Sequence, residues 1–190
     1  MARNRTTVDR EEKRAEILDA ATDLFLTNGY EATSMTALAK AAGIATNTIY
    51  WYFDDKDALF IEVAERTFGE SLAEYGAQVL PTLVDRLLWL VTVFERLNGL
   101  TATVHARARV SPSISTWHDD FHATADRWLI HQARQHLAAG ANHTPPPTDE
   151  QLAAIPRIWS YAIEGMVVHQ LSDRERRQVC ETLVRQLDAL

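Results

Sequence analysis

The chain has 190 residues, a formal net charge of −7 and a hydrophobic content of 46%, which is ordinary for a globular protein of one or two domains. This acidity argues against broad, sequence-independent affinity for nucleic acid. Its single cysteine, Cys180, excludes an intramolecular disulfide and any multi-cysteine metal site. The longest apolar run, residues 87–94, is too short to span a bilayer, and no signal peptide is visible, so we expect a cytoplasmic protein.

The N-terminal residues predict one amphipathic helix. Residues 1–8 have no apolar periodicity, and we expect them to be disordered without DNA, with Thr7 or Asp9 capping the helix that follows. A buried helical face is then predicted from the spacing of Ile17, Ala21, Leu24 and Phe25, and the helix is expected to end at Asn28-Gly29.

Three further short or medium helices are predicted next. Ser34 is a favourable cap for the second, and Gly43 can end it because glycine adopts a left-handed backbone without steric cost. The third helix is expected to begin near Thr46. Asp54 or Asp55 begins the fourth, which runs into the mid-70s.

The rest of the chain is also helical and more apolar. The pattern predicts helices over residues 84–97, 101–110, 115–139, 149–171 and 173–189. The prolines of residues 143–147 predict a loop, Thr148 and Ser172 begin capping boxes, and Pro156 is expected to bend the helix that contains it. Because no strand-like alternation occurs, the predicted fold class is all-α.

The third predicted helix is unusual in composition. Hydroxyl, amide and aromatic groups crowd its two turns, in Thr46, Asn47, Thr48, Tyr50, Trp51 and Tyr52. Such groups are costly to bury unpaired but suit a surface that meets phosphates and base edges. A small structural helix with aromatic packing is the alternative interpretation. Ile49 and Phe53, four residues apart, would anchor the helix to a core.

An ordered set of motifs surrounds this helix and resembles the DNA-binding domain of the TetR family of bacterial transcriptional regulators. The motifs cover roughly residues 15–60. They are Ala20-Ala21, Leu24-Phe25, Gly29-Tyr30, Thr33-Ser34, Ala42-Gly43-Ile44, Ile49-Tyr50-Trp51-Tyr52-Phe53 and Lys56. The family often has Ser or Thr where this chain has Ala45, so Thr46 is expected to take over the cap of the third helix one residue later.

The resemblance implies a DNA-binding domain at residues 1–58, joined by the fourth helix to a helical ligand-binding and dimerisation domain at 59–190. It implies a non-enzymatic transcriptional regulator without cofactor or catalytic residues. We expect a homodimeric repressor that binds a palindromic operator and is released by a small, mainly apolar molecule. A ligand-independent DNA-binding regulator and a small metal-dependent enzyme remain alternatives.

By the same resemblance, three groups of side chains face DNA. Base edges would be read by Thr46, Asn47 and Thr48, with Asn47 placed for bidentate contact with adenine. Phosphates and sugars would be held by Tyr50, Trp51 and Tyr52, and further phosphates by Thr33, Ser34 and Lys56.

The predicted ligand-binding and dimerisation domain, residues 59–190, is called the body below. It is rich in aromatic residues, which form either an ordinary core or the wall of a ligand pocket. The candidate ligand-binding residues are Trp89, Phe94, His105, Arg109, Trp117, Phe121, Trp128 and Trp159. On the last helix, Val179, Leu183, Leu187 and Leu190 form an apolar stripe. Burial within one subunit would explain the stripe, but the resemblance favours a homodimer interface formed by the last two helices.

His118 and His122 lie one helical turn apart, a spacing that can bind zinc. No third ligand follows from the sequence, and His105, His131 or His136 could join them only through the tertiary structure. Exposed or pocket-lining histidines are the favoured interpretation, so we expect no metal site.

Overall fold

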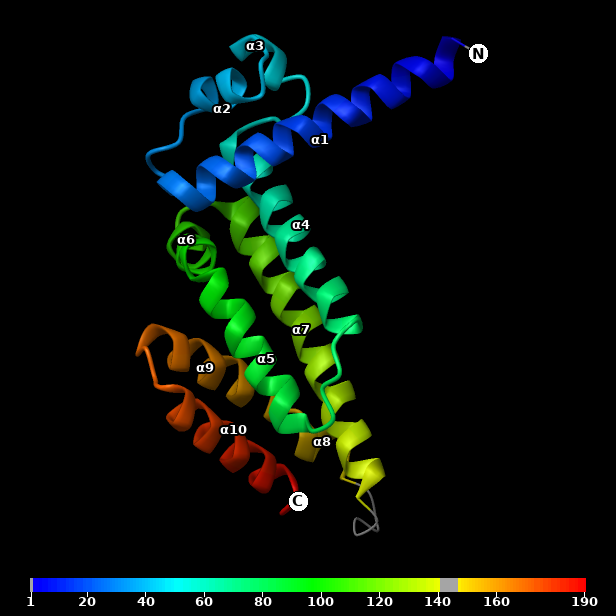
Figure 1. Cartoon of the computed structure of the whole chain (residues 1–190), viewed down its shortest axis with the longest axis vertical. Helices are drawn as coiled ribbons and strands as arrows, with labels where there is room; N and C mark the ends of the chain where they lie inside the picture. Colours follow the sequence, from blue (N-terminus) through cyan, green and yellow to red (C-terminus); the bar gives the residue numbers. More distant parts are fainter. Residues whose placement is uncertain (1, 141–146) are drawn as a thin grey trace. The chain divides into compact units, whose positions relative to one another are not determined.

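A computed structural model of the chain describes residues 2–140 and 147–190, and within these residues every regular element is helical, as expected for an all-α fold. Figure 1 labels the helices. In chain order they are α1 (Ala2–Asn28), α2 (Met35–Ala41), α3 (Thr46–Ile49), α4 (Lys56–Gly76), α5 (Leu83–Arg96), α6 (Asn98–Ala108), α7 (Pro112–Ala139), α8 (Asp149–Leu152), α9 (Ile155–Val168) and α10 (Asp173–Leu187). None of the described helices is long and apolar enough to cross a membrane.

The chain forms two compact units. The first contains the residues up to Gly76 together with 99–118, and the second contains 77–98 together with 119–190. The first unit therefore holds α1 to α4, α6 and the first turns of α7, and the second holds α5, the rest of α7 and α8 to α10. The functional division at residue 58 is a different one and stays a prediction.

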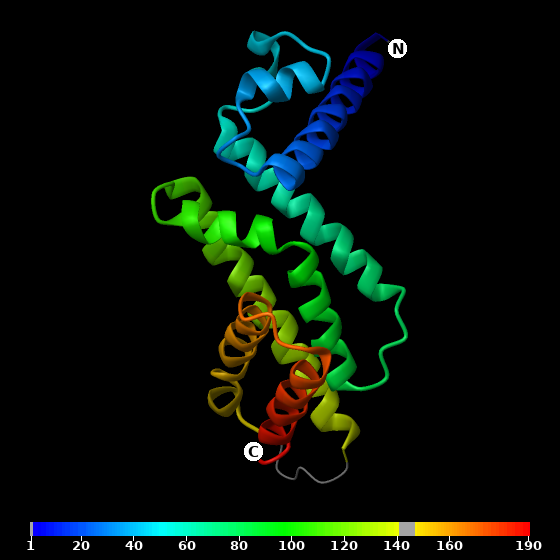
Figure 2. The same cartoon turned by 60° about the vertical axis from the view of Figure 1, so that its left-hand side comes forward.

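The core of the first unit explains why its short helices are stable. One face of α1 buries Ile17, Ala21 and Phe25, at the helical spacing that the sequence showed. Leu38 of α2 and Ile49 of α3 are fully buried in the same cluster. Both α2 and α3 are too short to persist alone in water, so this shared burial holds them. Figure 2 shows the two short helices, in light blue, beside α1 in dark blue.

The turn between α2 and α3 confirms one sequence expectation and corrects another. Gly43 has a φ of +67°, the left-handed conformation that ends α2. However, Ala45, not Thr46, is the N-cap of α3: its backbone is extended and no side chain caps the helix. Burial of Ile49 stabilises α3 sufficiently without a capping hydroxyl, so Thr46 is the first helical residue.

Several predicted helix boundaries differ from the structure, two of them substantially. Helices α6 and α7 each begin three residues earlier than predicted, at Asn98 and Pro112. The first helix begins at Ala2 instead of at residues 7–9. Asn4, Thr6, Thr7 and Val8 are weak helix formers, but extending an established helix costs less than starting a new one, so the helix continues back over them. The helix predicted over residues 149–171 is divided into α8 and α9. Pro156 cannot donate a backbone hydrogen bond and clashes with the preceding turn, so the chain breaks there and Pro156 lies in the first turn of α9.

The second unit is built on α5, against which α9 and α10 both pack (Figure 1). Its core contains Leu87, Trp159, Leu183 and Leu187, so two residues of the predicted dimer stripe are buried within the chain itself. The predicted capping boxes that begin α8 and α10 are both present. The predicted loop at 143–147 lies outside the described residues except for its last proline.

Candidate nucleic-acid interface

The third helix presents a polar and aromatic face to solvent. Trp51 is 77% exposed, Tyr50 is about half exposed and Asn47 is exposed, whereas Ile49 and Phe53 are buried in the core. A largely exposed tryptophan is unusual because its ring could bury a large apolar area. This exposure fits a surface that meets a partner.

The backbone beyond α3 keeps these side chains together. The Trp51 amide donates to the Thr48 carbonyl at 3.1 Å and the Tyr52 amide donates to the Ile49 carbonyl at 3.0 Å, so the helical turn continues past Ile49. Asn47 therefore lies three and four residues before Tyr50 and Trp51 on a helical surface, the spacing that places residues on one face. Thr46, Thr48 and Tyr52 are half-buried beside this face.

Two arginines of α1 contact the residues that directly follow α3. Arg10 Nη2 lies 3.4 Å from the Trp51 carbonyl, and its guanidinium carbon is 5.9 Å from the centre of the Tyr52 ring. The guanidinium carbon of Arg14 is 5.0 Å from the centre of the buried Phe53 ring. Sequence reasoning missed the role of both arginines. Their spacing of four residues on α1 was the available signal that they share a face.

The N-terminus of α2 offers a second candidate contact. Ser34 is exposed and caps α2, with its Oγ accepting from the Ala37 amide at 3.1 Å. Thr33 differs, because it is only 1% exposed and its hydroxyl donates to the Gly29 carbonyl at 2.8 Å. Thr33 thus stabilises the loop between α1 and α2, and its phosphate contact stays a prediction.

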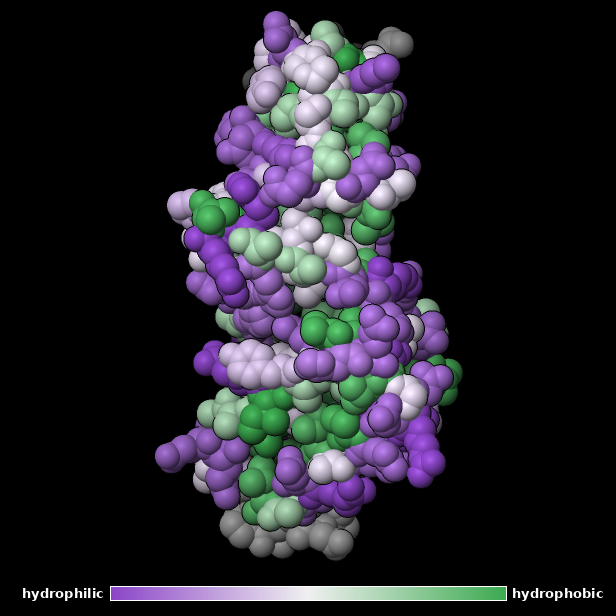
Figure 3. All heavy atoms as spheres, turned by 90° about the vertical axis from the view of Figure 1, so that its left-hand side faces the viewer, coloured by the Kyte–Doolittle hydropathy of each residue, from purple (hydrophilic) through white to green (hydrophobic). Residues whose placement is uncertain are grey.

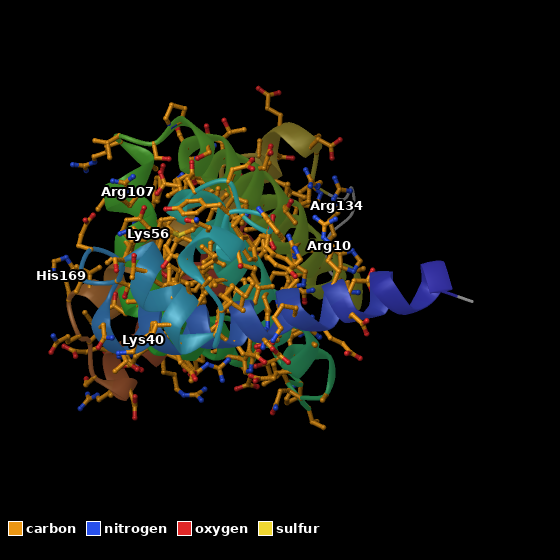
Figure 4. The ribbon with its side chains drawn as sticks, turned by 90° about the horizontal axis from the view of Figure 1, so that it is seen from above. Arg10, Lys40, Lys56, Arg107, Arg134 and His169 are labelled. Atoms are coloured by element: carbon orange, nitrogen blue, oxygen red, sulfur yellow. The ribbon has the colours of Figure 1, made fainter. Side chains whose placement is uncertain are left out.

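Lys56 also has internal partners. Its ammonium donates to the carbonyls of Tyr30 and Thr33, both at 3.0 Å, and lies 3.9 Å from the centre of the Tyr30 ring. These bonds occupy two of its three donors and tie the start of α4 to the loop after α1. A phosphate contact through the remaining donor stays a prediction. Figure 4 shows Lys56 close to Arg107 of α6 and apart from Lys40 of α2.

A charged cluster at the start of α4 joins that helix to α6. Arg107 Nη2 lies 3.0 and 2.9 Å from the two carboxylate oxygens of Asp57, and the Tyr30 hydroxyl donates to the same carboxylate. Burial opposes ionisation of Asp57, but hydrogen bonds from Tyr30, Ser111 and Arg107 outweigh it and lower its pKa. Burial and the neighbouring carboxylate raise the pKa of Tyr30, which therefore stays protonated.

The predicted ligand-binding residues divide between the two units. The first unit contains His105, Arg109 and Trp117, and the second contains Trp89, Phe94, Phe121, Trp128 and Trp159. Trp159 is fully buried and lies in the core, with Phe94 and Trp128 packed against the same cluster. Trp117 is half-buried, and its indole N–H donates to Glu65 at 3.2 Å. Ordinary packing thus accounts for part of the set.

Comparison with known proteins shows which proteins share this helix-turn-helix. Residues 17–63 match the family model described as bacterial regulatory proteins, tetR family. The chain is 43% identical over 81 residues to the HTH-type transcriptional regulator AcrR of Shigella flexneri, covering 41% of this chain and 37% of AcrR. It is 32% identical over 98 residues to the HTH-type transcriptional regulator YhgD of Bacillus subtilis, covering 49% of this chain and 51% of YhgD. The matches thus span only about a third to a half of these relatives.

A solved structure extends the likeness of fold over nearly the whole chain. A transcriptional regulator of Saccharomonospora viridis, solved in complex with choline, superposes with a TM-score of 0.69 at 19% identity, covering 92% of this chain and 96% of that one. Residues 17–63, which match the family model, contain α2, α3 and the exposed face formed by Asn47, Tyr50 and Trp51. Residues 17–63 therefore form a DNA-binding domain of the TetR family of bacterial regulatory proteins, and over the rest of the chain the likeness is one of helical fold.

Proposed function

We propose that the protein is a transcriptional repressor that binds a palindromic operator as a homodimer in the cytoplasm and is released by a small, mainly apolar molecule. Residues 1–58 would act as the DNA-binding domain, and residues 59–190 would bind the ligand and dimerise. The observation that carries the proposal is the exposed face of Asn47, Tyr50 and Trp51 on the third helix of a TetR-type domain.

The DNA contacts follow from exposure and chemistry. Asn47, the second residue of α3, is exposed and can donate to and accept from one adenine edge, while Thr46 and Thr48 flank it. Tyr50 and Trp51 would contact phosphates and sugars beside the groove. Ser34 would add a phosphate contact at the N-terminus of α2.

Titrations on two DNAs test base readout. Asn47→Ala should cost about 1–3 kcal/mol on a selected operator and much less on random DNA, because the lost contacts are to a base. Lys40→Ala, which removes an exposed cation on α2, is a useful comparison because a phosphate contact would weaken both DNAs alike and reduce the salt dependence. Equal losses on both DNAs for Asn47→Ala would remove this residue from base readout.

The dimer proposal rests on an exposed stripe of α9. About half or more of the side chain is exposed in each of Ile158, Tyr161 and Val168, and Tyr161 is 65% exposed. Gly165 lies between them, and a Cβ added there would meet no atom within 4 Å. Their spacing of three, four and three residues places them on one face of the helix. Figure 3 shows hydrophobic side chains gathered on the face that includes α9 and α10. Leu183 and Leu187 are buried within the chain, so α10 would contribute other residues.

Light scattering tests this interface. Tyr161→Glu should convert the dimer to monomer because it places a charge in the apolar seam. Val79→Glu is the matched control: Val79 is 90% exposed, lies between α4 and α5, and should not affect the dimer. Wild-type protein that stays monomeric at micromolar concentration would exclude the proposed mode of operator binding.

The effector proposal is supported by the aromatic body and by the choline-bound relative. An effector would bind more tightly to a dimer state whose DNA-binding domains are wrongly spaced for the operator. The resulting loss of operator affinity can be no larger than the difference between the effector's affinities for the two dimer states. Body tryptophans would report its binding through fluorescence quenching, measured in a Trp51→Phe background so that DNA-binding changes do not contribute. A candidate compound that quenches fluorescence without releasing the operator would favour ligand-independent regulation.

A further inference from the structure

The turn between α6 and α7 brings together histidines that are distant in sequence. His105 lies in the last turn of α6 and His118 in the second turn of α7. Both belong to the first unit, and their imidazole rings meet edge to face with centroids 5.1 Å apart. The connection between the two helices is short and packed: Ser111 is buried, its Oγ accepts from the Ile114 amide at 3.4 Å, and Ile114 is fully buried.

His122 is the third member of the group. Helix α7 continues unbroken from Pro112 to Ala139, so helix geometry alone places His122 one turn beyond His118 on the same face. One potential ligand atom from each of His105, His118 and His122 lies within 4.8 Å of the other two. The three side chains are half-buried, which leaves them accessible to a small ion while restricting their movement.

These residues suit a transition metal. Imidazole nitrogen is a preferred ligand of Zn²⁺, Ni²⁺, Co²⁺ and Cu²⁺, whereas Mg²⁺ and Ca²⁺ prefer oxygen. Zinc–nitrogen bonds of about 2.0–2.1 Å in tetrahedral geometry require nitrogen separations of about 3.3 Å. Closing separations of at most 4.8 Å to about 3.3 Å is within the range that rotation about side-chain torsions can supply.

We infer that His105, His118 and His122 form a binding site for a divalent transition-metal ion, with a fourth position open to water or another ligand. The site links the end of α6 to the beginning of α7. His105 is two residues before Arg107, whose guanidinium contacts Asp57 at the start of α4. A bound ion would therefore stabilise the end of α6, which contacts the start of α4 through Arg107. This inference stands apart from the proposed repression and effector.

The first test is a zinc titration of the full chain without an affinity tag, in competition with a chromophoric chelator. We expect one equivalent of Zn²⁺ per chain, bound more tightly than about 10 µM. Cobalt bound at the same site should give visible absorption bands that zinc displaces. At a hundredfold excess of Zn²⁺ over its Kd, the Tm should rise by about 5–10 °C, because the ion binds the folded protein.

Variants locate the site. Replacing His105, His118 or His122 by Gln should each lower zinc affinity at least about tenfold, since each change removes one ligand. His131→Gln is the matched control: it makes the same substitution on α7 at an exposed histidine whose Nε2 lies 2.9 Å from Gln135 Nε2. Circular dichroism would establish which variants fold, and three separate ligand variants keep the test decisive if one does not.

Several results would overturn the inference. Absence of saturable zinc binding by the wild-type chain would exclude the site. Unchanged affinity in the folded ligand variants, or loss of binding in His131→Gln, would place any bound ion elsewhere on the surface.

Discussion

Removal of Arg107 should destabilise the fold measurably, because this arginine joins α6 to the start of α4. Its Nη2 lies 3.0 and 2.9 Å from the Asp57 oxygens, and the two side chains are only 25% and 16% exposed. Hydrogen bonds to charged groups contribute about 1.5–3 kcal/mol, whereas exposed ion pairs contribute about 0–1 kcal/mol. The Nε–H of Arg107 is buried without a partner among the described residues, which offsets part of the gain.

From these opposing effects, Arg107→Met should lower the free energy of unfolding by about 1–2 kcal/mol at pH 7. For a chain of this size the corresponding fall in Tm is about 2–8 °C. Urea denaturation followed by circular dichroism measures the loss. Arg109→Met is the matched control, since Arg109 is exposed two residues further on and its replacement should change stability by less than about 0.5 kcal/mol.

The pH dependence of the Arg107 effect has a defined sign. The pKa of Asp57 is lowered in the folded protein, because hydrogen bonds from Tyr30, Ser111 and Arg107 outweigh burial. Its stabilising contribution is therefore fully present above its unfolded pKa of about 3.9 and is lost as the pH falls through the lower folded value. The difference between wild type and Arg107→Met should shrink below about pH 4. Equal stability of Arg107→Met and Arg109→Met at pH 7 would refute this account of the α4–α6 contact.

Two other substitutions and one chemical probe test neighbouring features. Lys56→Met should lower the free energy of unfolding by about 1–3 kcal/mol, because it leaves the carbonyls of Tyr30 and Thr33 without the Lys56 ammonium as their donor. An unchanged urea midpoint together with weaker DNA binding would contradict this and would indicate that Lys56 serves only to bind phosphate. Trp51→Ala should leave stability within about 0.5 kcal/mol while weakening operator binding, since its ring is exposed. Burial raises the pKa of Cys180 to about 11, so its native thiol should react with a disulfide reagent at pH 8 at least about a hundredfold more slowly than in urea; comparable rates would contradict its burial.

Local sequence signals predicted most of the helix-turn-helix. Burial of Ile17, Ala21 and Phe25 followed from their helical spacing, and the end of α2 followed from Gly43. The start of α1 was not predictable from apolar periodicity, because that periodicity reports packing, whereas an established helix can extend over residues that have no apolar face. The break before α9 followed only in part, since Pro156 signals a disturbance but does not decide between a bend and a break.

Long-range pairings were beyond the sequence. Nothing local to Lys56 shows that its ammonium binds two carbonyls, or that Arg107, 50 residues after Asp57, contacts that carboxylate. The same limitation applies to the histidines: the spacing of His118 and His122 was visible, but the arrival of His105 depends on the turn between α6 and α7. The apolar stripe of α10 was also ambiguous, because helical periodicity cannot distinguish an internal core from an interface between subunits.

The central claim is that the exposed face of α3 selects a two-fold symmetric DNA site. Fragments of the source genome bound by the purified full chain, followed by footprinting of the enriched sequence, test it most directly. The proposal predicts two inverted half-sites whose centres are about 34 Å apart or a multiple of that distance, with enrichment lost for Asn47→Ala. Binding of all fragments alike, or the same enriched sequence for wild type and Asn47→Ala, would contradict it.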